Sequence, residues 1–184
     1  LAPFGAGVLV RSGRPEQIPG CDGGAFYVQD PAHALVVRYA GIPRGATVYD
    51  ACAAPGGKTL ALSHRGLTVI AADRSRRRVA RVAENIARAG RGSERIIVAD
   101  AGHPPVRPVA AYLLDAPCLG TGTFARHPDA RLRVTPTARA ERAAAQARLL
   151  DAAADRIAPG GLLCYATCSL EPEENEMQVA AFLA

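Results

Sequence analysis

The stretch Val48-Tyr49-Asp50-Ala51-Cys52-Ala53-Ala54-Pro55-Gly56-Gly57-Lys58-Thr59 decides the fold of this chain. It begins as a short apolar strand, passes through a turn of small residues and continues into the start of a helix. Glycine lets the backbone approach a ligand closely, and the amides at a helix N-terminus favour polar or negative groups. Asp73 follows about twenty positions later, the spacing at which an acid binds a ribose in dinucleotide sites. The stretch therefore predicts a site for a nucleoside-containing cofactor.

Strands and helices are expected to alternate along the rest of the chain. Apolar runs predict strands at 26–29, 47–51, 67–72, 95–99, 110–114 and 162–166. Helical periodicity and capping residues predict helices at 31–40, 57–64, 74–89, 137–158 and 171–183, with a turn at Pro159-Gly160-Gly161. This alternation is typical of an α/β fold built on a doubly wound, mostly parallel sheet.

Composition favours a nucleic-acid partner and argues against a metal site. The 184 residues are 49% apolar and carry a net charge of +5, and Lys58 is the single lysine among many arginines. Arginine suits phosphate contacts, which favours a nucleic-acid partner. The five cysteines form no CxxC pair and the histidines are not spaced with them, so no metal site is expected. Free thiols and the lack of a transmembrane run indicate a cytoplasmic protein, which we expect to be monomeric.

The turn does not match the common phosphate-binding patterns. A phosphate loop needs glycine six residues before its lysine, whereas that position here is Cys52. Pro55 also lacks an amide that would face a phosphate, and the G-x-G-x-x-G pattern of nicotinamide sites is missing. The remaining candidate is S-adenosylmethionine, which has no phosphates.

Acids at successive strand ends fit the parts of that cofactor. Asp73 is expected to accept from the ribose hydroxyls and Asp100 from the adenine amino group, while Asp50 and the turn hold the methionine part. The carboxyl ends of parallel strands share one edge of the sheet, where ligands bind. The residues of the turn expected to contact the cofactor are Cys52, Ala53, Ala54, Pro55, Gly56, Gly57 and Lys58.

Two further stretches end on this edge, and each holds a cysteine. Asp115-Ala116-Pro117-Cys118 follows the fourth strand and Ala166-Thr167-Cys168-Ser169 the fifth. Together the segments VYDACAAPGGKT, LLDAPCLGTGTFARHPD and YATCSLEPEENE resemble the Sun (Fmu), or NOL-NOP-Sun, family of RNA cytosine-C5 methyltransferases, which includes enzymes of bacterial 16S rRNA. The resemblance runs from Phe26 to Leu183.

The resemblance implies a Rossmann-like, S-adenosylmethionine-dependent methyltransferase that acts on RNA, with rRNA as the expected substrate. One catalytic domain would span 1–184, with a loop-rich segment at 1–24 and the Rossmann-like core at 25–184. Because the chain begins at Leu1 rather than Met, we expect a fragment of a longer protein. It would lack the last strand pair of such sheets and any N-terminal RNA-binding extension.

The resemblance also assigns chemistry to the two thiols. A thiolate that adds to C6 of cytosine makes C5 nucleophilic enough to take a methyl group. By carry-over, Cys168 is the nucleophile and Cys118 assists proton removal or release. Asp115 binds the cofactor and orients or protonates the cytosine, and Lys58 stabilises its surroundings. The residues alone do not rank the thiols, because DNA cytosine methyltransferases use a Pro-Cys nucleophile, which would be Cys118.

A basic loop after Cys118 is expected to contact RNA phosphates. The residues expected to do so are Arg126, His127, Arg131 and Arg133. Two other functions remain open: a methyltransferase of another substrate on the same fold, and a non-catalytic RNA-binding factor in ribosome assembly.

Overall fold

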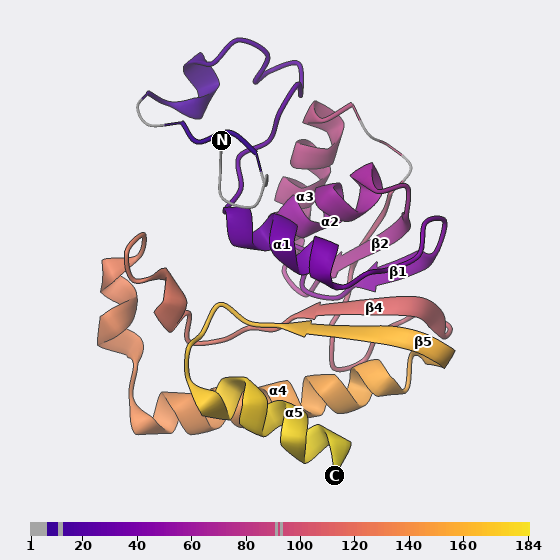
Figure 1. The fold of residues 1–184 in the computed structure, drawn as a ribbon, viewed down its shortest axis with the longest axis vertical. Coiled ribbons are helices and arrows are strands. Elements are labelled where there is room, and N and C mark those ends of the chain that lie inside the picture. Colours follow the sequence, from indigo (N-terminus) through magenta and orange to yellow (C-terminus); the bar gives the residue numbers. More distant parts are fainter. Residues whose placement is uncertain (1–6, 11–12, 91, 93) are drawn as a thin grey trace.

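A computed structural model describes residues 7–10, 13–90, 92 and 94–184. Within these residues, parallel strands form one sheet of order β3-β2-β1-β4-β5 (Figure 1). The strands are β1 (Thr47–Asp50), β2 (Thr68–Asp73), β3 (Arg95–Val98), β4 (Val109–Asp115) and β5 (Ile157–Ala166). The strand order reverses between β1 and β4, and this reversal is where doubly wound sheets bind ligands.

Helices cover both faces of the sheet. Figure 1 shows α1 (Pro31–Tyr39), α2 (Gly57–His64) and α3 (Arg76–Arg88) on one face, and α4 (Pro136–Ala154) and α5 (Glu176–Leu183) on the other. Short 3-10 helices occupy Pro15–Gln17, Thr121–Thr123, Pro128–Arg133 and Pro172–Glu174. The predicted doubly wound, Rossmann-like α/β fold is confirmed, and the sheet is parallel throughout the described strands.

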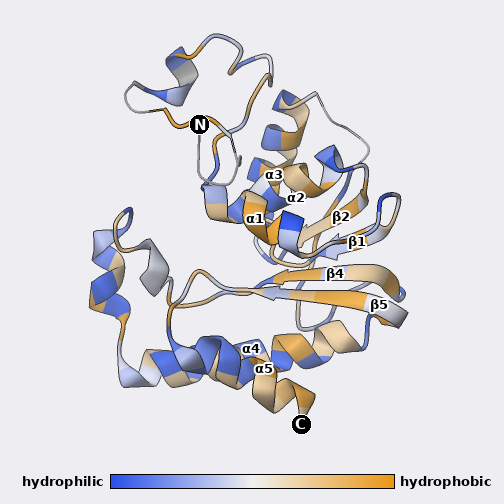
Figure 2. Cartoon of the chain, in the orientation of Figure 1, coloured by the Kyte–Doolittle hydropathy of each residue, from blue (hydrophilic) through white to orange (hydrophobic). Residues whose placement is uncertain are grey.

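The central strands are buried on both faces, as parallel strands between two helical layers must be. Alternate residues of β1 and β4 point to opposite layers: Val48 and Leu113 pack towards α1 and α2, whereas Tyr49 and Tyr112 pack towards α4. The two tyrosine rings lie 5.0 Å apart between centroids. Figure 2 shows hydrophobic residues along β4 and its neighbour β5.

Local capping explains where two helices begin. Asp30 Oδ1 accepts a hydrogen bond from Ala32 N at 2.7 Å at the start of α1, and Pro31 occupies the first helical position. Thr135 Oγ1 accepts from Ala138 N at 3.1 Å at the start of α4. The helix predicted from Asp30-Pro31 is confirmed.

Several local predictions were wrong. Residues 26–29 form no strand. The helix expected to reach residue 158 ends at Ala154, and β5 runs through the predicted turn at 159–161. Pairing with β4 explains why β5 includes residues 159–161. The register between the two strands shifts between the pairs Val109↔Ile157 and Ala111↔Leu162, and the proline and glycines lie in the resulting bulge.

The last helix begins later than its sequence pattern predicts. Asn175 has φ −126° and ψ −104°, which is not helical, and it separates α5 from the 3-10 helix Pro172–Glu174. Its Nδ2 donates to Ser169 O at 3.1 Å and to Glu171 O at 2.9 Å. These bonds hold the chain after β5 in a turn.

The described residues before α1 hold little regular structure. Part of the predicted loop-rich segment 1–24 lies outside the described residues, namely 1–6 and 11–12. Its described part holds the 3-10 helix Pro15–Gln17. Among the described residues, no helix combines the length and apolar composition that crossing a membrane requires.

Leu150 offers a test of the packing between α4 and the sheet, since only 2% of it is exposed. We expect Leu150→Ala to lower the free energy of unfolding by about 2–5 kcal/mol, because it leaves a cavity under the sheet. The control Leu132→Ala removes a side chain that is 87% exposed, and it should change stability by less than about 0.5 kcal/mol. Urea unfolding followed by circular dichroism measures both, and equal effects would contradict the packing described.

Candidate active site

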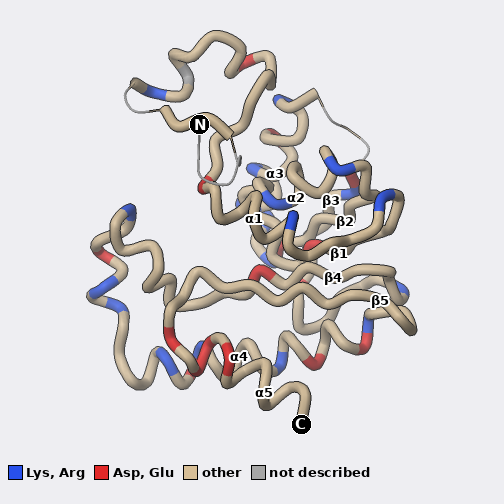
Figure 3. The backbone as a smooth tube through the Cα atoms, in the orientation of Figure 1, with Lys and Arg blue, Asp and Glu red and all other residues tan. Residues whose placement is uncertain are grey.

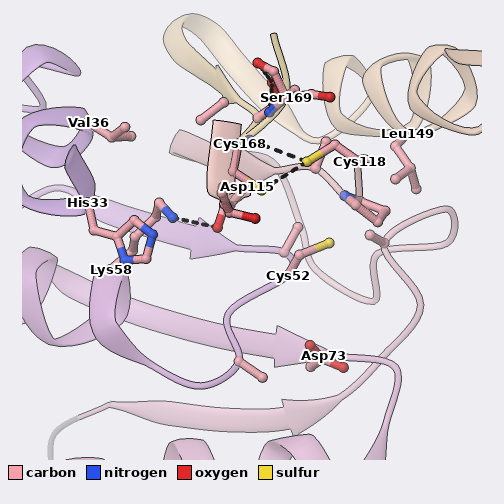
Figure 4. Close-up of a pocket in the computed structure, with 18 of the residues that line it drawn as sticks. His33, Val36, Cys52, Lys58, Asp73, Asp115, Cys118, Leu149, Cys168 and Ser169 are labelled. Atoms are coloured by element: carbon pink, nitrogen blue, oxygen red, sulfur yellow. Dashed lines mark hydrogen bonds and ion pairs between the residues drawn. The ribbon is translucent and has the colours of Figure 1, made fainter. Parts of the chain in front are cut away.

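A cavity of about 500 Å³ lies at the carboxyl edge of the sheet. One end is formed by Asp73, the last residue of β2, and by Asp100, which follows β3. The other end is formed by Cys118, which follows β4, and Cys168, which follows β5. Figure 4 shows Asp73 well separated from the two sulfurs, with Cys52 and Asp115 between them. The predicted cofactor acids and the predicted thiols therefore line one cavity.

The turn after β1 is held against α3. Gly56 has φ +106°, and a Cβ at this position would lie 3.4 Å from Val82 Cγ1. Asn85 Nδ2 donates to Pro55 O at 2.8 Å, and an Arg78 nitrogen donates to Ala54 O at 3.1 Å. A left-handed glycine and a close neighbouring helix give the tight turn that the sequence predicts.

Two carboxylates mark the end of the cavity far from the thiols. Asp73 is 2% exposed, accepts from Ser75 N at 3.0 Å, and pairs with Arg78 at 3.2 Å. Asp100 Oδ1 accepts from Gly102 N at 2.8 Å. Ala101 and Leu149 add an apolar wall beside them. Carboxylate acceptors next to an apolar wall fit an adenosine without phosphates, since hydroxyl and amino groups would donate to them.

Asp50 lies beneath the cavity rather than in its wall. The residue is fully buried, and its carboxylate accepts from Thr59 Oγ1 at 2.7 Å. Burial raises the pKa of Asp50 to about 7. This contact fixes the first turn of α2 to the end of β1, and binding of the methionine part by Asp50 stays a prediction. Gly56 is likewise buried in the turn and outside the cavity wall.

An ion pair joins the turn to the thiol end of the cavity. Lys58 Nζ lies 2.5 Å from Asp115 Oδ2, and the lysine side chain is only 8% exposed. Figure 4 shows His33 of α1 beside this lysine. Burial, followed by the charge of Lys58, lowers the pKa of His33, so its imidazole is neutral at pH 7. The first turn of α2 thus places one cation next to the Asp115 carboxylate.

The two thiols are in direct contact. Cys118 Sγ and Cys168 Sγ lie 3.2 Å apart, and Cys168 N donates to Cys118 Sγ at 3.3 Å (Figure 4). The hydrogen bond from the Cys118 thiol lowers the pKa of Cys168 to about 7, with Lys58 acting in the same direction and Asp115 against it. The same contact raises the pKa of Cys118. These opposite pKa directions favour Cys168 as the thiolate and Cys118 as its hydrogen-bond donor, and the ranking of the two thiols stays a prediction.

The other cysteines near the site differ in kind. Burial raises the pKa of Cys52 to about 12, and burial also raises that of Cys164. A thiol that stays protonated is a poor nucleophile, so neither side chain competes with Cys118 and Cys168 for that role. Cys52 lines the cavity, and its contact with the cofactor stays a prediction. In the described part of the chain, no three His, Cys, Asp or Glu side chains are placed to share a metal ion.

The basic loop lies beside a second hollow of about 610 Å³ that adjoins the first. Both hollows share Lys58, Asp115, Cys168 and Arg126 in their walls. Arg126 forms an ion pair with Asp30 of the α1 cap, and His127 lines the second hollow only. The turn residues Ala53, Ala54, Pro55 and Gly57 also face this hollow.

Arg131 and Arg133 lie outside both hollows, on the exposed 3-10 helix Pro128–Arg133. The Arg131 guanidinium lies 5.3 Å from the centre of the Phe124 ring, and Arg133 pairs with Asp129 at 2.7 Å. Figure 3 shows basic residues on this loop and over α2 and α3. The loop therefore presents positive charge beside the thiol end of the cavity.

Sequence reasoning missed the residues that support the thiols from behind. Glu174 and Gln146 are fully buried and connect the loops after β4 and β5. His33 was missed too, although it lines both hollows. The cluster of acids at Glu171–Glu174 was a signal, because charged residues so close to a reactive thiol are rarely without a partner.

Comparison with known proteins places this site in a family. The profile described as 16S rRNA methyltransferase RsmB/F matches residues 42–184. The chain belongs to this family. Its curated RsmB/F relatives include ribosomal RNA small subunit methyltransferase B of Pseudomonas syringae, 41% identical over 96% of this chain, and that of Vibrio cholerae, 40% identical over 91%. The chain spans about 40% of the length of these relatives.

Solved structures agree with the RsmB/F assignment. NSun6 from Pyrococcus horikoshii with SFG, an S-adenosylmethionine analogue, has a TM-score of 0.83 at 30% identity, covering 91% of this chain and 44% of its own. A methyltransferase homolog protein from Pyrococcus horikoshii has a TM-score of 0.79 at 30% identity, covering 95% and 56%. The predicted family and the predicted methyltransferase fold are both confirmed.

The thiol pair predicts selective alkylation. Because the thiolate is the reactive form, iodoacetamide should modify Cys168 with a rate that rises through a midpoint near pH 7. Cys118→Ala removes the hydrogen-bond donor, so the midpoint should move up towards that of an ordinary thiol. Peptide mass mapping of the alkylated protein follows each cysteine separately, with Cys52 as the slow internal control. Faster modification of Cys118 than of Cys168 would reverse our ranking of the thiols.

Proposed function

We propose that this chain is the catalytic domain of an S-adenosylmethionine-dependent methyltransferase that acts on C5 of a cytosine in ribosomal RNA. The observation that carries the proposal is the contact of two thiols, 3.2 Å apart, at one end of a cavity whose other end presents Asp73 and Asp100. Family membership supports rRNA as the substrate class.

The far end of the cavity holds the methyl donor. Asp73 would accept from the ribose hydroxyls, Asp100 would accept from the adenine amino group, and the turn Cys52–Lys58 would hold the methionine part. When bound, the donor supplies an electrophilic methyl group on a sulfonium. Asp50 supports this end indirectly, because its bond to Thr59 fixes the first turn of α2.

Cys168 carries out the covalent step. Its thiolate forms a bond to C6 of the cytosine, the C5=C6 electron pair moves to C5, and C5 takes the methyl group. The methyl–sulfur bond of the donor breaks, and its electron pair stays on the sulfur, which becomes a neutral thioether. The C5 proton then leaves to water, and its electron pair reforms C5=C6 and expels the Cys168 thiolate. Asp115 orients the cytosine, and the adjacent Lys58 stabilises the charge that develops on the base.

Cys118 assists at both ends of this cycle. Its S–H group stabilises the Cys168 thiolate before attack, and it does so again when the thiolate leaves C6. The 3.2 Å contact between the sulfurs allows both roles without movement of the loops. A charge-assisted hydrogen bond of this kind is stronger than one between neutral groups.

The RNA side is formed by the basic loop. Arg126, His127, Arg131 and Arg133 contact phosphates around the target, which positions the strand without reading its sequence. The target base leaves its stack to reach Cys168. Reduced thiols at Cys118 and Cys168 require a reducing compartment, for which we propose the cytoplasm. We infer that the protein acts as a monomer.

A covalent complex with RNA tests the chemistry. RNA that carries 5-fluorocytosine cannot lose a C5 proton, so the protein should remain bonded to it after methyl transfer. We expect Cys168→Ala to abolish the complex on a denaturing gel and Cys118→Ala to retain it. The reverse pattern would make Cys118 the nucleophile. Donor binding without any complex would indicate another substrate, and RNA binding without methyl transfer would indicate an assembly factor.

Asp73 tests the donor end. We expect Asp73→Asn to weaken binding of S-adenosylhomocysteine by about 10- to 100-fold, because a hydrogen bond to a charged acceptor contributes about 1.5–3 kcal/mol. The control Asp151→Asn changes an acid on the exposed face of α4 and should leave the affinity unchanged. Isothermal titration calorimetry measures both. An unchanged affinity for the Asp73 variant would remove Asp73 from the donor site.

A further inference from the structure

A buried carboxylate lies directly behind the two thiols and takes no part in the chemistry above. Glu174 is fully buried at the end of the 3-10 helix Pro172–Glu174. Burial of a charged group is costly unless it is paired or hydrogen-bonded, and apolar packing would fill the same space at lower cost. The contacts of Glu174 therefore indicate what the charge is for.

The Glu174 carboxylate contacts both loops that hold the thiols, the loop after β4 with Cys118 and the loop after β5 with Cys168. Leu119 N, directly after Cys118 in the chain, donates to both carboxylate oxygens at 3.1 and 3.3 Å. The Ser169 hydroxyl, directly after Cys168, donates to Oε2. One buried group thus holds the residue that follows each thiol.

Gln146 of α4 extends this connection to the other side of Cys118. Its Nε2 donates to Glu174 Oε1 at 2.8 Å and to Pro117 O at 3.1 Å, and the residue is fully buried. Glu174 is itself held in place, because Tyr165 OH of β5 donates to its carbonyl oxygen at 2.7 Å. The Pro-Cys loop is therefore fixed before and after Cys118 relative to β5.

The sheet alone does not fix the two sulfurs. The ladder between β4 and β5 ends at Asp115↔Ala166, before either cysteine. Beyond that pair, the loops touch through the bond from Gly122 N to Cys168 O at 3.0 Å, through the bond from Leu170 N to Thr121 Oγ1 at 2.8 Å and through the thiols themselves. Glu174 adds a fully buried carboxylate that contacts both loops and, through Gln146, also connects them to α4.

We propose that Glu174 is a positioning residue that fixes the distance and direction between the Cys118 and Cys168 thiols. Its consequence for methyl transfer rests on the proposed function, but its effect on the thiols does not. The groups that face Cys168 are Cys118, Asp115 and Lys58, and only the first is held by Glu174. Loss of Glu174 therefore weakens the thiol–thiolate hydrogen bond and leaves the Lys58–Asp115 ion pair in place.

The test is the pH profile of Cys168 alkylation in the whole chain without RNA or methyl donor. In Glu174→Ala, we expect the midpoint to rise from about 7 by roughly one pH unit, which slows alkylation at pH 7 about five- to tenfold. Glu174→Gln retains an acceptor for Leu119 and Gln146, and it should keep a profile close to the unchanged protein.

A matched control separates positioning from stability. Gln178 of α5 is 7% exposed and donates to Ala143 O of α4, away from the thiols. Gln178→Ala should lower the melting temperature, as Glu174→Ala does, without moving the Cys168 midpoint. An unchanged midpoint in Glu174→Ala, or an equal shift in Gln178→Ala, would overturn the proposal.

Two further readouts keep the test decisive. If Glu174→Ala does not fold, Gln146→Leu removes the bridge to Pro117 and should raise the midpoint by a smaller amount, whereas no shift would count against the proposal. The covalent complex with 5-fluorocytosine RNA is measured in parallel. A shifted midpoint together with no complex in the unchanged protein would leave the positioning role standing and reject the proposed function.

Discussion

Parallel pairing of β4 with both β1 and β5 is the constraint on which the site depends. It makes three chain segments leave the sheet at one edge: the small-residue turn after β1, the Pro-Cys loop after β4 and the Thr-Cys loop after β5. Residues about fifty positions apart in the sequence are thereby brought into contact, such as the hydrogen-bonded thiols of Cys118 and Cys168. The helices on either face bury the strands and keep that edge free to receive ligands.

Electrostatics at this edge work through pairs. Asp73 has Arg78, Asp115 has Lys58 and Asp50 has the Thr59 hydroxyl. A thiolate beside the Asp115 carboxylate would be disfavoured, and the lysine and the neighbouring thiol offset this repulsion. The same balance explains why the pKa of Cys168 is lowered, whereas that of Cys52, which is buried and close to several acids, is raised.

Much of the fold and site was predictable because it depends on local patterns. The strand–turn–helix at β1, the acids at the strand ends and the two cysteine motifs all lie in short stretches of sequence. The bulge at Pro159–Gly161 was not predictable, since it follows from pairing with β4. The ranking of the two thiols as nucleophile depends on a contact between two loops, which the sequence does not reveal. In the sequence, Glu174 is one acid in an acidic run, and only the fold shows that Leu119, Gln146 and Ser169 contact it.

The ion pair at Lys58 has a consequence for the chemistry of the whole chain. Lys58 is the single lysine of the sequence, and 8% of its side chain is exposed. A compact ammonium fits this confined position, where a planar guanidinium would demand more space and more acceptors. Side-chain amine chemistry is therefore concentrated in the reaction centre. Within these 184 residues, an amine-selective reagent that modifies Lys58 therefore reports how open that centre is.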